Sequence, residues 1–459
     1  MDNAKTCCII VYGCAKNRVD AEEMASRLKG AGYRLSADPL QADAIVVHTC
    51  GFIEDAKRES IDGILRAVGI AQEMAETGRA PTVVVTGCLS QRYPGELLAE
   101  MPEIGGIAGT RAPRDIVEIV GAALGGSKVA DVGGPGRGAP GEGVRREPFT
   151  PGSTWAYLRV SEGCRHHCTY CAIPSMRGPL VSRTPEDILD EARWLVARGV
   201  RELNLIAQDL SDYGSDFSNE RLLATLVNKL AGIPDIGWLR LLYLRPDGVT
   251  QELAEALDNP RVAPYVDLPV EHGSARILRL MGRPGPDRIV EAVETLRARV
   301  PGIFIRTTVI AGFPGETEKD VDETINLLKA IGAHRVGVFP FSREEGTPAF
   351  SLPRPVPAEA ARERAEAIRK IGLGMAKRSS ESLLGRDIPV LLTGPSERPG
   401  YWLARGPHQA PEVDGRTYVK VTATLGKHAG GPVYATVTRA GVLNLFASYP
   451  GRSQTATRV

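Results

Sequence analysis

The segment AIVVHTCGF, residues 44–52, is a run of small and β-branched apolar residues that stops at a cysteine and a glycine. Two other segments end in the same way: IIVYGC, residues 9–14, and VVVTGC, residues 83–88. Continuous apolar strands separated by helical stretches are typical of a parallel sheet that is covered on both faces. Ligands gather at the carboxyl ends of the strands in such sheets, so the three terminal cysteines are predicted to meet at one edge. They are Cys14, Cys50 and Cys88. The alternative, three unrelated buried thiols, predicts no common position relative to the strands.

The sequence around these strands alternates between strand and helix patterns from residue 7 to about 124. VDAEEMASRLKGAGY, residues 19–33, is predicted to be a helix that ends near Gly30 or Gly32. A second helical stretch covers residues 54–76. We therefore expect an N-terminal parallel-sheet α/β domain over residues 1–124. Residues 125–150 are dense in Gly and Pro and have no apolar period, which predicts a linker.

The bulk composition is that of a globular protein. Hydrophobic residues make up 43% and charged residues 24% of the 459 residues, a length that corresponds to about three domains. Lys and Arg number 56 against 55 Asp and Glu, so net charge gives no global signal for nucleic-acid binding. No apolar run approaches the ~18 residues of a membrane span, and the start MDNAKT lacks the pattern of a secretory signal. We expect a cytoplasmic protein with no membrane partner.

A second βα region extends from Trp155 to about Ser342. Its six strand candidates are AYLRVS, ELNLIAQ, WLRLLYL, YVDLPV, FIRTTVI and VGVFPF. Between the first two strands, a helix is predicted with Thr184 as its cap, Pro185 at its first position and Gly199 at its end. Six consecutive βα units predict a partial (β/α)6 barrel whose functional loops lie at the carboxyl ends of the strands. With a long charged helix that follows it, this domain covers residues 151–384.

The remainder of the chain changes character. IPVLLT, TYVKVTATL and PVYATVTRA are short alternating strands between Gly and Pro turns, which predicts a small all-β barrel over residues 385–450 and a tail over 451–459. From Gly385 onward there are nine Lys or Arg against four Asp or Glu. The module is mildly basic, and this alone decides nothing about its partner.

All eight cysteines precede residue 172, and in a reducing compartment such clustering favours metal binding or chemistry over disulfides. The segment SEGCRHHCTYCAIPSMRG, residues 161–178, follows the first strand of the second βα region and contains C-x3-C-x2-C. One loop can thus place three thiolates, on Cys164, Cys168 and Cys171, around one metal. Three is one fewer than a closed zinc or iron–sulfur site uses. One interpretation is a zinc loop with His166 or His167 as fourth ligand. The other is a 4Fe-4S cluster with one open iron, which the position at a barrel mouth favours.

At this point the sequence resembles a known family. C-x3-C-x2-C after the first strand of a six-repeat barrel, with Tyr170 before the last cysteine, is similar to the radical S-adenosylmethionine (SAM) enzymes. Three separated N-terminal cysteines, a radical SAM barrel and a small β module of the TRAM type resemble the methylthiotransferases among them. The segments that carry the resemblance are GCAKNRVDAE (13–22), TCGFIEDAKRESID (49–62), TGCLSQRY (86–93), IPSMRGPLVSR (173–183), QDLSDYG (208–214) and APEVDG (410–415). They look like the branch that methylthiolates an aspartate of ribosomal protein S12.

The resemblance implies two 4Fe-4S clusters. One, on the cysteines of the C-x3-C-x2-C loop, would bind SAM and cleave it to a 5′-deoxyadenosyl radical that removes hydrogen from the β-carbon of the aspartate. The other, on Cys14, Cys50 and Cys88, would hold the sulfur, and a second SAM would supply the methyl group. The implied partners are S12, free or in the small ribosomal subunit, and an electron donor such as a flavodoxin or a ferredoxin. The sulfur donor is not indicated.

The resemblance also suggests residues that contact SAM. Gln208 and Asp209 end the second barrel strand, where the wider family binds the SAM amino group. Arg306 and Gly312 lie in RTTVIAGFPGE, residues 306–316, although a simple βα turn would have a similar sequence. Arg183 suits a carboxylate because its planar fork pairs in a bidentate way, yet it could equally hold Glu186 or Asp187.

Three positions depart from the expected family pattern: His48 replaces an Asn, Ala15 a Pro and Glu271 a Gln. Ala15 and His48 flank predicted ligands, Glu271 ends a strand near the expected SAM pocket, and none removes a ligand. Cys7 and Cys8 lie inside the first strand, where packing is expected. His408 and His428, in the β module, are expected at the surface.

Two rival functions remain open on the sequence. A sister enzyme that methylthiolates an adenosine of tRNA would use the same layout, but those relatives usually carry Asn where this chain has Asp209. A zinc-stabilised RNA-binding scaffold would need no catalysis.

Overall fold

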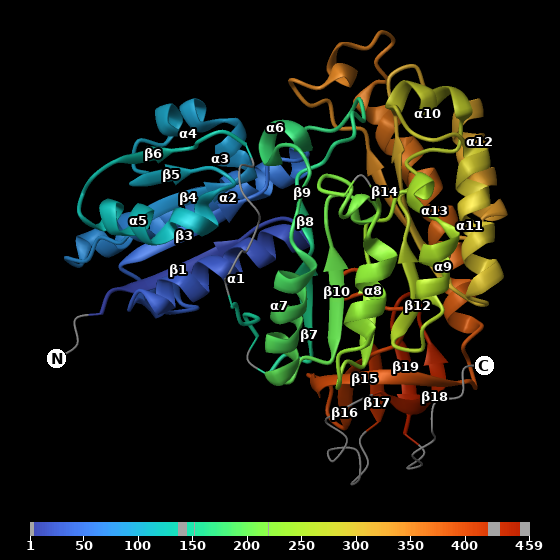
Figure 1. Cartoon of the computed structure of the whole chain (residues 1–459). Coiled ribbons are helices and arrows are strands. Elements are labelled where there is room, and N and C mark those ends of the chain that lie inside the picture. Colours follow the sequence, from blue (N-terminus) through green and yellow to red (C-terminus); the bar gives the residue numbers. More distant parts are fainter. Residues whose placement is uncertain (1–3, 136–144, 151, 219, 421–431, 450–459) are drawn as a thin grey trace. The chain divides into compact units, whose positions relative to one another are not determined.

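The computed structural model describes residues 4–135, 145–150, 152–218, 220–420 and 432–449 (Figure 1). The chain divides into two compact units. The first contains Met1–Phe149, Arg159–Ile188 and Ser342–Phe350, and the second contains Thr150–Leu158, Leu189–Phe341 and Ser351–Val459. Among the described residues, no helix is both long enough and apolar enough to cross a lipid bilayer.

The first unit is built on a six-stranded parallel sheet with the order β2-β1-β3-β4-β5-β6. Its strands are β1 (Thr6–Val11), β2 (Arg34–Leu35), β3 (Ala44–Thr49), β4 (Thr82–Gly87), β5 (Gly106–Ala108) and β6 (Val129–Asp131). The helices between them are α1 (Ala15–Gly30), η1 (Pro39–Gln41), α2 (Glu54–Glu76), α3 (Cys88–Arg92), α4 (Pro94–Glu100) and α5 (Ala112–Leu124). The predicted parallel α/β fold is confirmed. Strand β6 falls inside the stretch predicted as a linker, whose residues 136–144 lie outside the described part.

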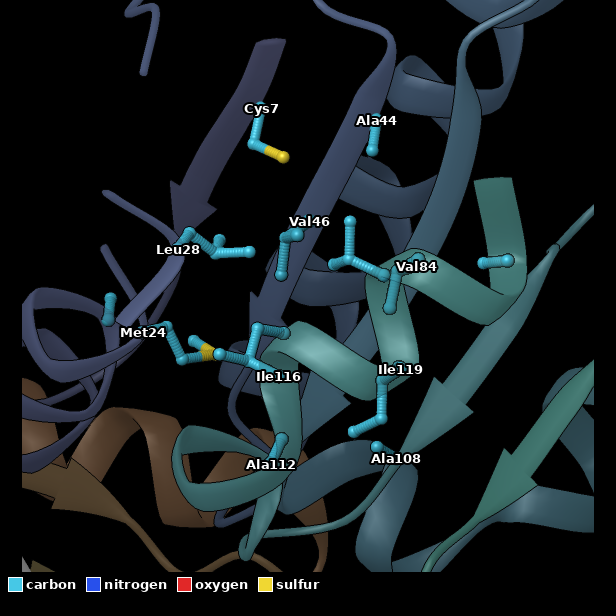
Figure 2. Packing of buried hydrophobic residues seen from close by; sticks show 13 residues of the cluster. Cys7, Met24, Leu28, Ala44, Val46, Val84, Ala108, Ala112, Ile116 and Ile119 are labelled. Carbon is cyan, nitrogen blue, oxygen red and sulfur yellow. The ribbon is translucent and has the colours of Figure 1, made fainter. Parts of the chain in front are cut away.

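Apolar side chains cover both faces of this sheet, as its continuous strand patterns predict. On one face Met24 and Leu28 of α1 and Ile116 and Ile119 of α5 pack against alternate strand residues such as Val46 (Figure 2). On the other face, the apolar residues of α2 and α4 pack against the intervening strand residues, among them Ile45, Val47 and Val85. Cys7 and Cys8 point to opposite faces and are buried, as expected of small apolar residues.

The first unit also contains a short hairpin-like pair and one further helix. Strands β8 (Ser161–Glu162) and β9 (Val181–Ser182) are antiparallel, and α6 (Ile173–Arg177) lies between them in the chain. The cysteine loop therefore leaves β8 and returns through α6 to β9.

The second unit contains the sheet of the partial barrel, in the order β14-β13-β12-β11-β10-β7. Its six strands are those predicted: β7 (Trp155–Arg159), β10 (Glu202–Ile206), β11 (Trp238–Leu241), β12 (Val262–Asp267), β13 (Phe304–Ala311) and β14 (Arg335–Pro340). The helices are α7 (Pro185–Ala197), η2 (Leu210–Asp212), α8 (Leu223–Ala231), η3 (Pro246–Gly248), α9 (Gln251–Leu257), α10 (Ala275–Met281), α11 (Pro286–Arg299), α12 (Glu318–Ala330), η4 (Pro348–Ser351) and α13 (Ala358–Glu381). The hydroxyl of Thr184 accepts from the N–H of Asp187 at 3.3 Å, which is the predicted cap of α7.

The C-terminal module is a closed five-stranded barrel, as predicted. Its strands, in the order β15-β16-β17-β19-β18, are β15 (Asp387–Pro395), β16 (Tyr401–Arg405), β17 (Thr417–Lys420), β19 (Leu445–Ser448) and β18 (Val433–Ala440). The end of the predicted strand TYVKVTATL, and His428, lie outside the described residues.

A buried ionic layer joins this barrel to the sheet within the second unit. Glu202 of β10 accepts from Arg240 of β11 at 2.9 Å and from Arg405 of β16. Asp414, from the recognised segment APEVDG, accepts from the hydroxyl of Tyr265 at 2.6 Å. The expectation that His408 lies at the surface is wrong, because the ring is buried against Phe304 between the two modules. Burial, with the cations Arg335 and Arg240 nearby, lowers the pKa of His408 to about 3.

Candidate metal centres

The ends of three neighbouring strands bring Cys14, Cys50 and Cys88 to one edge of the first sheet. Cys50 follows the last residue of β3, and Cys88 follows the last residue of β4 and begins α3. The pairing of Thr49 with Gly87 puts these two strand ends level. Cys14 begins the next element after β1, as the N-cap of α1. The common edge that the strand pattern predicts is thus present.

Glycines let the three segments approach one another closely. Gly13 has φ +99°, and a Cβ there would lie 2.6 Å from the Cβ of Cys50 and 3.0 Å from its Sγ. Gly87 has φ +105°, and a Cβ there would lie 2.5 Å from the carbonyl oxygen of Thr49. Only glycine combines such backbone angles with such contacts. Each glycine adjoins a cysteine, so these close approaches bring the segments that carry Cys14, Cys50 and Cys88 together at the sheet edge.

The three thiols lie close enough to affect one another's ionisation. Burial, together with the neighbouring Cys14 and Cys88, raises the pKa of Cys50 to about 12. Burial also raises the pKa of Cys88, an effect that the guanidinium of Arg177 opposes. Cys14 is exposed, whereas Cys50 and Cys88 are buried. The site is a pocket that is open at Cys14, and burial keeps the thiols of Cys50 and Cys88 protonated until a cation replaces the protons.

Two polar side chains complete this pocket. Asn17 of α1 donates its amide to the carbonyl oxygens of Tyr12 at 2.8 Å and Thr49 at 3.0 Å, which ties together the ends of β1 and β3. Its own oxygen accepts from Nη2 of Arg177 at 2.7 Å. Nε of Arg177 lies 3.4 Å from Sγ of Cys88 and donates to it. The guanidinium of Arg177 therefore points at Cys88, one of the three sulfurs.

The cysteine loop packs against this pocket within the first unit. Cys88 belongs to an apolar cluster with Ala172 and Met176, against which Phe52 and Ile173 also pack. Ala172 is the residue after Cys171, so the last cysteine of the loop is one residue from a member of the apolar cluster that contains Cys88. The hydroxyl of Thr110 donates to the carbonyl oxygen of Met176 at 2.9 Å and holds α6 in place. Two sets of three cysteines are thus joined by a single short helix.

The loop set is built from local backbone geometry. Cys164, Cys168 and Cys171 are half-buried thiols. The N–H of His166 donates to Sγ of Cys164 at 3.4 Å, and the N–H of Cys171 donates to the carbonyl oxygen of Cys168 at 3.0 Å. The N–H of Cys164 is bonded to the carbonyl oxygen of Gly178 at 3.1 Å, which closes the loop.

Residues 342–350 link both cysteine sets in the same unit. The buried carboxylate of Glu344 accepts from Arg92 of α3 and from Lys57 of α2 at 3.1 Å. Arg92 also donates to the carbonyl oxygen of Gly51, next to Cys50, at 3.0 Å. At the other end of the segment, the N–H of Ala349 donates to the carbonyl oxygen of Thr169 in the cysteine loop at 2.8 Å. We call residues 342–350 the strap.

Buried carboxylates of α1 form ion pairs with Arg177, at the end of the cysteine loop segment, and with Arg159, at the end of β7. Asp20 pairs with Arg177 at 2.9 Å and with Arg159, and it lies 3.4 Å from Nε2 of His48. Glu23 pairs with Arg159 at 2.7 Å. Burial alone would raise the pKa of Asp20, but the two guanidinium groups and His48 hold it below its usual value. His48, the departure from the family pattern, thus joins this network, and its Nδ1 lies 2.8 Å from the hydroxyl of Thr86.

The residues predicted to contact SAM lie in different surroundings. Asp209 follows the end of β10, where its carboxylate accepts from the N–H of Ser211 at 2.9 Å and caps η2. Arg306 lies near the start of β13, where it donates to Asp267 at 2.8 Å and approaches Asp414 at 3.6 Å. Gly312 has φ +81°, and a Cβ there would lie 2.2 Å from Cβ of Ala361 in α13. These contacts favour packing over ligand binding for Arg306 and Gly312.

Two further residues have clear partners. Arg183 donates to Asp187 at 2.7 Å and to the carbonyl oxygen of Arg159 at 2.8 Å, which is the alternative role that its sequence position left open. Glu271 has φ +67° and bridges to Val309 of β13, and its carboxylate lies 3.7 Å from Arg283. Gln208 is the second residue after the end of β10. The SAM contacts of all these residues stay predictions.

Sequence reasoning missed four residues of the first unit: Asn17, Asp20, Arg177 and Glu344. The first three lie inside segments recognised by resemblance, but nothing in their local pattern shows that they meet. Glu344 gave no signal because it lies about 250 residues along the chain from its partner Arg92.

Both cysteine sets fit an iron–sulfur cluster by the chemistry of their donors. Each offers three thiols, the soft ligands that such clusters need. Backbone or guanidinium N–H groups already point at one sulfur in each set, as is usual for groups that tune bound clusters. The apolar wall of Phe52, Ala172 and Met176 limits access of water to the N-terminal set.

Three family models match the chain. The radical SAM superfamily matches residues 158–328, the TRAM domain matches residues 384–449, and an uncharacterized protein family, UPF0004, matches residues 6–109. The fold is similar to that of solved radical SAM proteins. The methyltransferase TsrM from Kitasatospora setae gives a TM-score of 0.55 at 15% identity, over 75% of this chain and 77% of that one. The cobalamin-dependent enzyme OxsB gives 0.55 at 14% identity, over 80% and 56%. The match to the radical SAM family model therefore identifies a radical SAM domain at residues 158–328, which includes the cysteine loop.

Similarity to curated proteins identifies the branch. The chain is 41% identical to the ribosomal protein uS12 methylthiotransferase RimO of Desulforudis audaxviator, over 96% of each chain. It is 43% identical to RimO of Anaeromyxobacter sp. over 89% of this chain and 86% of that one, and 41% identical to RimO of Geobacter sulfurreducens over 91% and 94%. The chain therefore belongs to the RimO family of radical SAM methylthiotransferases, as the resemblance predicted.

Proposed function

We propose that this protein transfers a methylthio group to the β-carbon of an aspartate in ribosomal protein S12. Relatives named ribosomal protein uS12 methylthiotransferase match nearly the whole chain at about 40% identity. The observation that carries the proposal is the apolar cluster that Cys88 shares with Ala172, the residue after Cys171. This cluster connects a site suited to hold sulfur with a site suited to cleave SAM.

The two cofactor sites divide the chemistry. When bound, a 4Fe-4S cluster at Cys164, Cys168 and Cys171 with SAM would supply the radical that removes hydrogen from the target carbon, and a 4Fe-4S cluster at the N-terminal set would hold the sulfur. Overall, C–H and one sulfide become C–S–CH3. One SAM takes the hydrogen and leaves as 5′-deoxyadenosine and methionine, and a second SAM gives the methyl group and leaves as S-adenosylhomocysteine. The electron that the donor supplies for SAM cleavage is released again when the C–S bond forms. No side-chain base is needed, since the β-carbon C–H is too weakly acidic for one.

The chain's own residues then bind, orient and shield. The strand ends and their glycines bring the three cysteines together, and α6 with Phe52 shields Cys88 from water. Gln208 and Asp209 are the SAM contacts we propose at the end of β10. The eight cysteines are thiols rather than disulfides, which suits a reducing compartment, so we place the protein in the cytoplasm, with a flavodoxin or a ferredoxin as electron donor.

Anaerobic reconstitution tests the cofactors. Two 4Fe-4S clusters predict about eight irons per chain, whereas stoichiometric zinc would contradict the proposal. The substrate is tested by mass spectrometry of S12 from a strain that lacks the gene. S12 should lose the mass of its methylthio group and regain it with the wild-type gene but not with the Cys50→Ala variant. A methylthio group that is instead lost from tRNA would identify the sister activity.

A further inference from the structure

The guanidinium of Arg177, in the first unit, bonds to one cysteine of the N-terminal set and to residues close in the chain to both sets. The side chain of Arg177 is only 3% exposed and ends the helix that follows the cysteine loop. Its Nε donates to Sγ of Cys88 at 3.4 Å, and Nη2 donates to Asn17, three residues after Cys14, at 2.7 Å. Nη1 donates to Glu162, two residues before Cys164, at 3.1 Å. A single planar group thus contacts the surroundings of both sets.

The carboxylates fix the orientation of this guanidinium. A buried guanidinium is tolerated only when its donors are paired, and Asp20 and Glu162 take its two Nη groups. Because the group is planar, fixing both Nη atoms also fixes the direction of Nε. That direction is toward the sulfur of Cys88. The ion pairs therefore orient the Nε–H group of Arg177 toward this sulfur.

We propose that Arg177 is a positioning residue for the N-terminal cluster, whose reduction potential it raises through its charge and its N–H to the sulfur of Cys88. The inference rests on the proposed function, because it requires a cluster at Cys14, Cys50 and Cys88. Hydrogen bonds to the sulfurs and nearby charge are the protein's main means of setting the potential of such clusters. A cation stabilises the reduced, more negative state. The same side chain holds α6, and with it Cys171, at a fixed place beside Cys88.

Arg159 provides a matched comparison. It is equally buried and binds the same carboxylates, Asp20 and Glu162, as well as Glu23. Within the described part of the chain, none of its hydrogen bonds or ion pairs reaches a cysteine. A change at Arg159 thus disturbs the ionic network without removing a donor to sulfur.

The experiment isolates the N-terminal cluster. In a parent with Cys164, Cys168 and Cys171 all changed to Ala, only the N-terminal set can load iron. Redox titration followed by electron paramagnetic resonance then compares the parent with Arg177→Lys, Arg177→Met and Arg159→Lys. The potential should fall from the parent to Arg177→Lys and further to Arg177→Met, while Arg159→Lys stays at the parent value. Equal potentials for the parent and both Arg177 variants would overturn the inference, and so would an Arg159→Lys shift as large as that of Arg177→Lys.

Iron content and thermal unfolding accompany each titration. If Arg177→Met loads no iron, the comparison of Arg177→Lys with Arg159→Lys decides, since both keep the charge. If the parent loads a cluster whose potential does not change with the substitutions at Arg177, only this inference is contradicted. A parent that takes up zinc, or no metal, contradicts the proposed function and the inference with it.

Discussion

The two cysteine sets of the first unit have the same number of thiols but are built in opposite ways. The loop set spans residues 164–171, so its three cysteines come from one continuous segment. The N-terminal set comes from three strands, with cysteines 36 and 38 residues apart. The loop thiols are half-buried, whereas Cys50 and Cys88 are buried beside a guanidinium. The first is a local motif, and the second exists only if the sheet forms in the correct register.

This difference suits the work of each site. A half-buried loop leaves one iron of a bound cluster accessible to a cofactor as large as SAM. A buried pocket with a fixed cation suits a group that must hold reactive sulfur away from water. The strap and α6 keep the two sites adjacent although they are built independently.

The largest expected effect is at the loop. Cys168→Ala should abolish both SAM cleavage and methylthiolation, because both depend on the cluster of this site. The protein should still fold and hold about four irons at the N-terminal set. Product analysis for 5′-deoxyadenosine and iron assay check this, and cleavage at the wild-type rate would remove the loop site from the mechanism.

Cys50→Ala should separate the two sites. Methylthiolation should be lost with the N-terminal cluster, while reductive SAM cleavage continues at the loop. The same two assays are sufficient, with Cys7→Ala as a control because Cys7 is buried in the core away from the pocket. If cleavage vanished while the loop cluster stayed loaded, the sites would not be independent.

Asp20→Asn should destabilise the fold around the N-terminal set. It leaves Arg159 and Arg177 short of one carboxylate in a buried network, at a cost of about 3–5 kcal/mol. Urea unfolding of the metal-free, reduced protein measures it. Asp190→Asn, which breaks an exposed pair with Arg193, should cost no more than about 1 kcal/mol.

The same carboxylate predicts a direction for acid sensitivity. The folded pKa of Asp20 is below its ordinary value of 3.8 because Arg177 and Arg159 outweigh the effect of burial. Its contribution is therefore present above about pH 4 and is lost as the pH falls further. Asp20→Asn should flatten this part of the stability profile, and an unchanged profile would assign the acid sensitivity to other groups.

Thiol reactivity should rank the cysteines of the N-terminal set. In metal-free, reduced protein at pH 8, iodoacetamide should modify exposed Cys14 first and Cys50 at least about tenfold more slowly. Burial raises the pKa of Cys50 to about 12, so its rate should continue to rise well above pH 9. Peptide mapping by mass spectrometry reads both rates. Equal rates would mean that the pocket opens without its metal.

The smallest effect concerns the strap. Glu344→Gln weakens the ion pairs with Lys57 and Arg92 and should cost about 1–3 kcal/mol. Hydrogen exchange in residues 342–350 should increase. Glu345→Gln is the matched control, because that side chain is exposed and only its carbonyl oxygen accepts from Arg92. Equal exchange in both variants would show that the strap is held by other contacts.

Local patterns predicted most of the fold. Apolar runs marked β3, β4 and the six barrel strands, and Thr184 marked the start of α7. Strand β6 was missed because its three residues lie among glycines and prolines. His408 was misplaced because a polar ring in a β module gives no sign that another module will cover it.

The sequence by itself determined which residues can be ligands and where strands end, because apolar period, turn residues and cysteine spacing act over short distances. The tertiary structure decided which charges meet. Asp20, Arg177 and Glu344 are ordinary charged residues in the sequence, and only the folded chain buries them together. Their roles depend on desolvation and on partners far along the chain, and no local pattern records either.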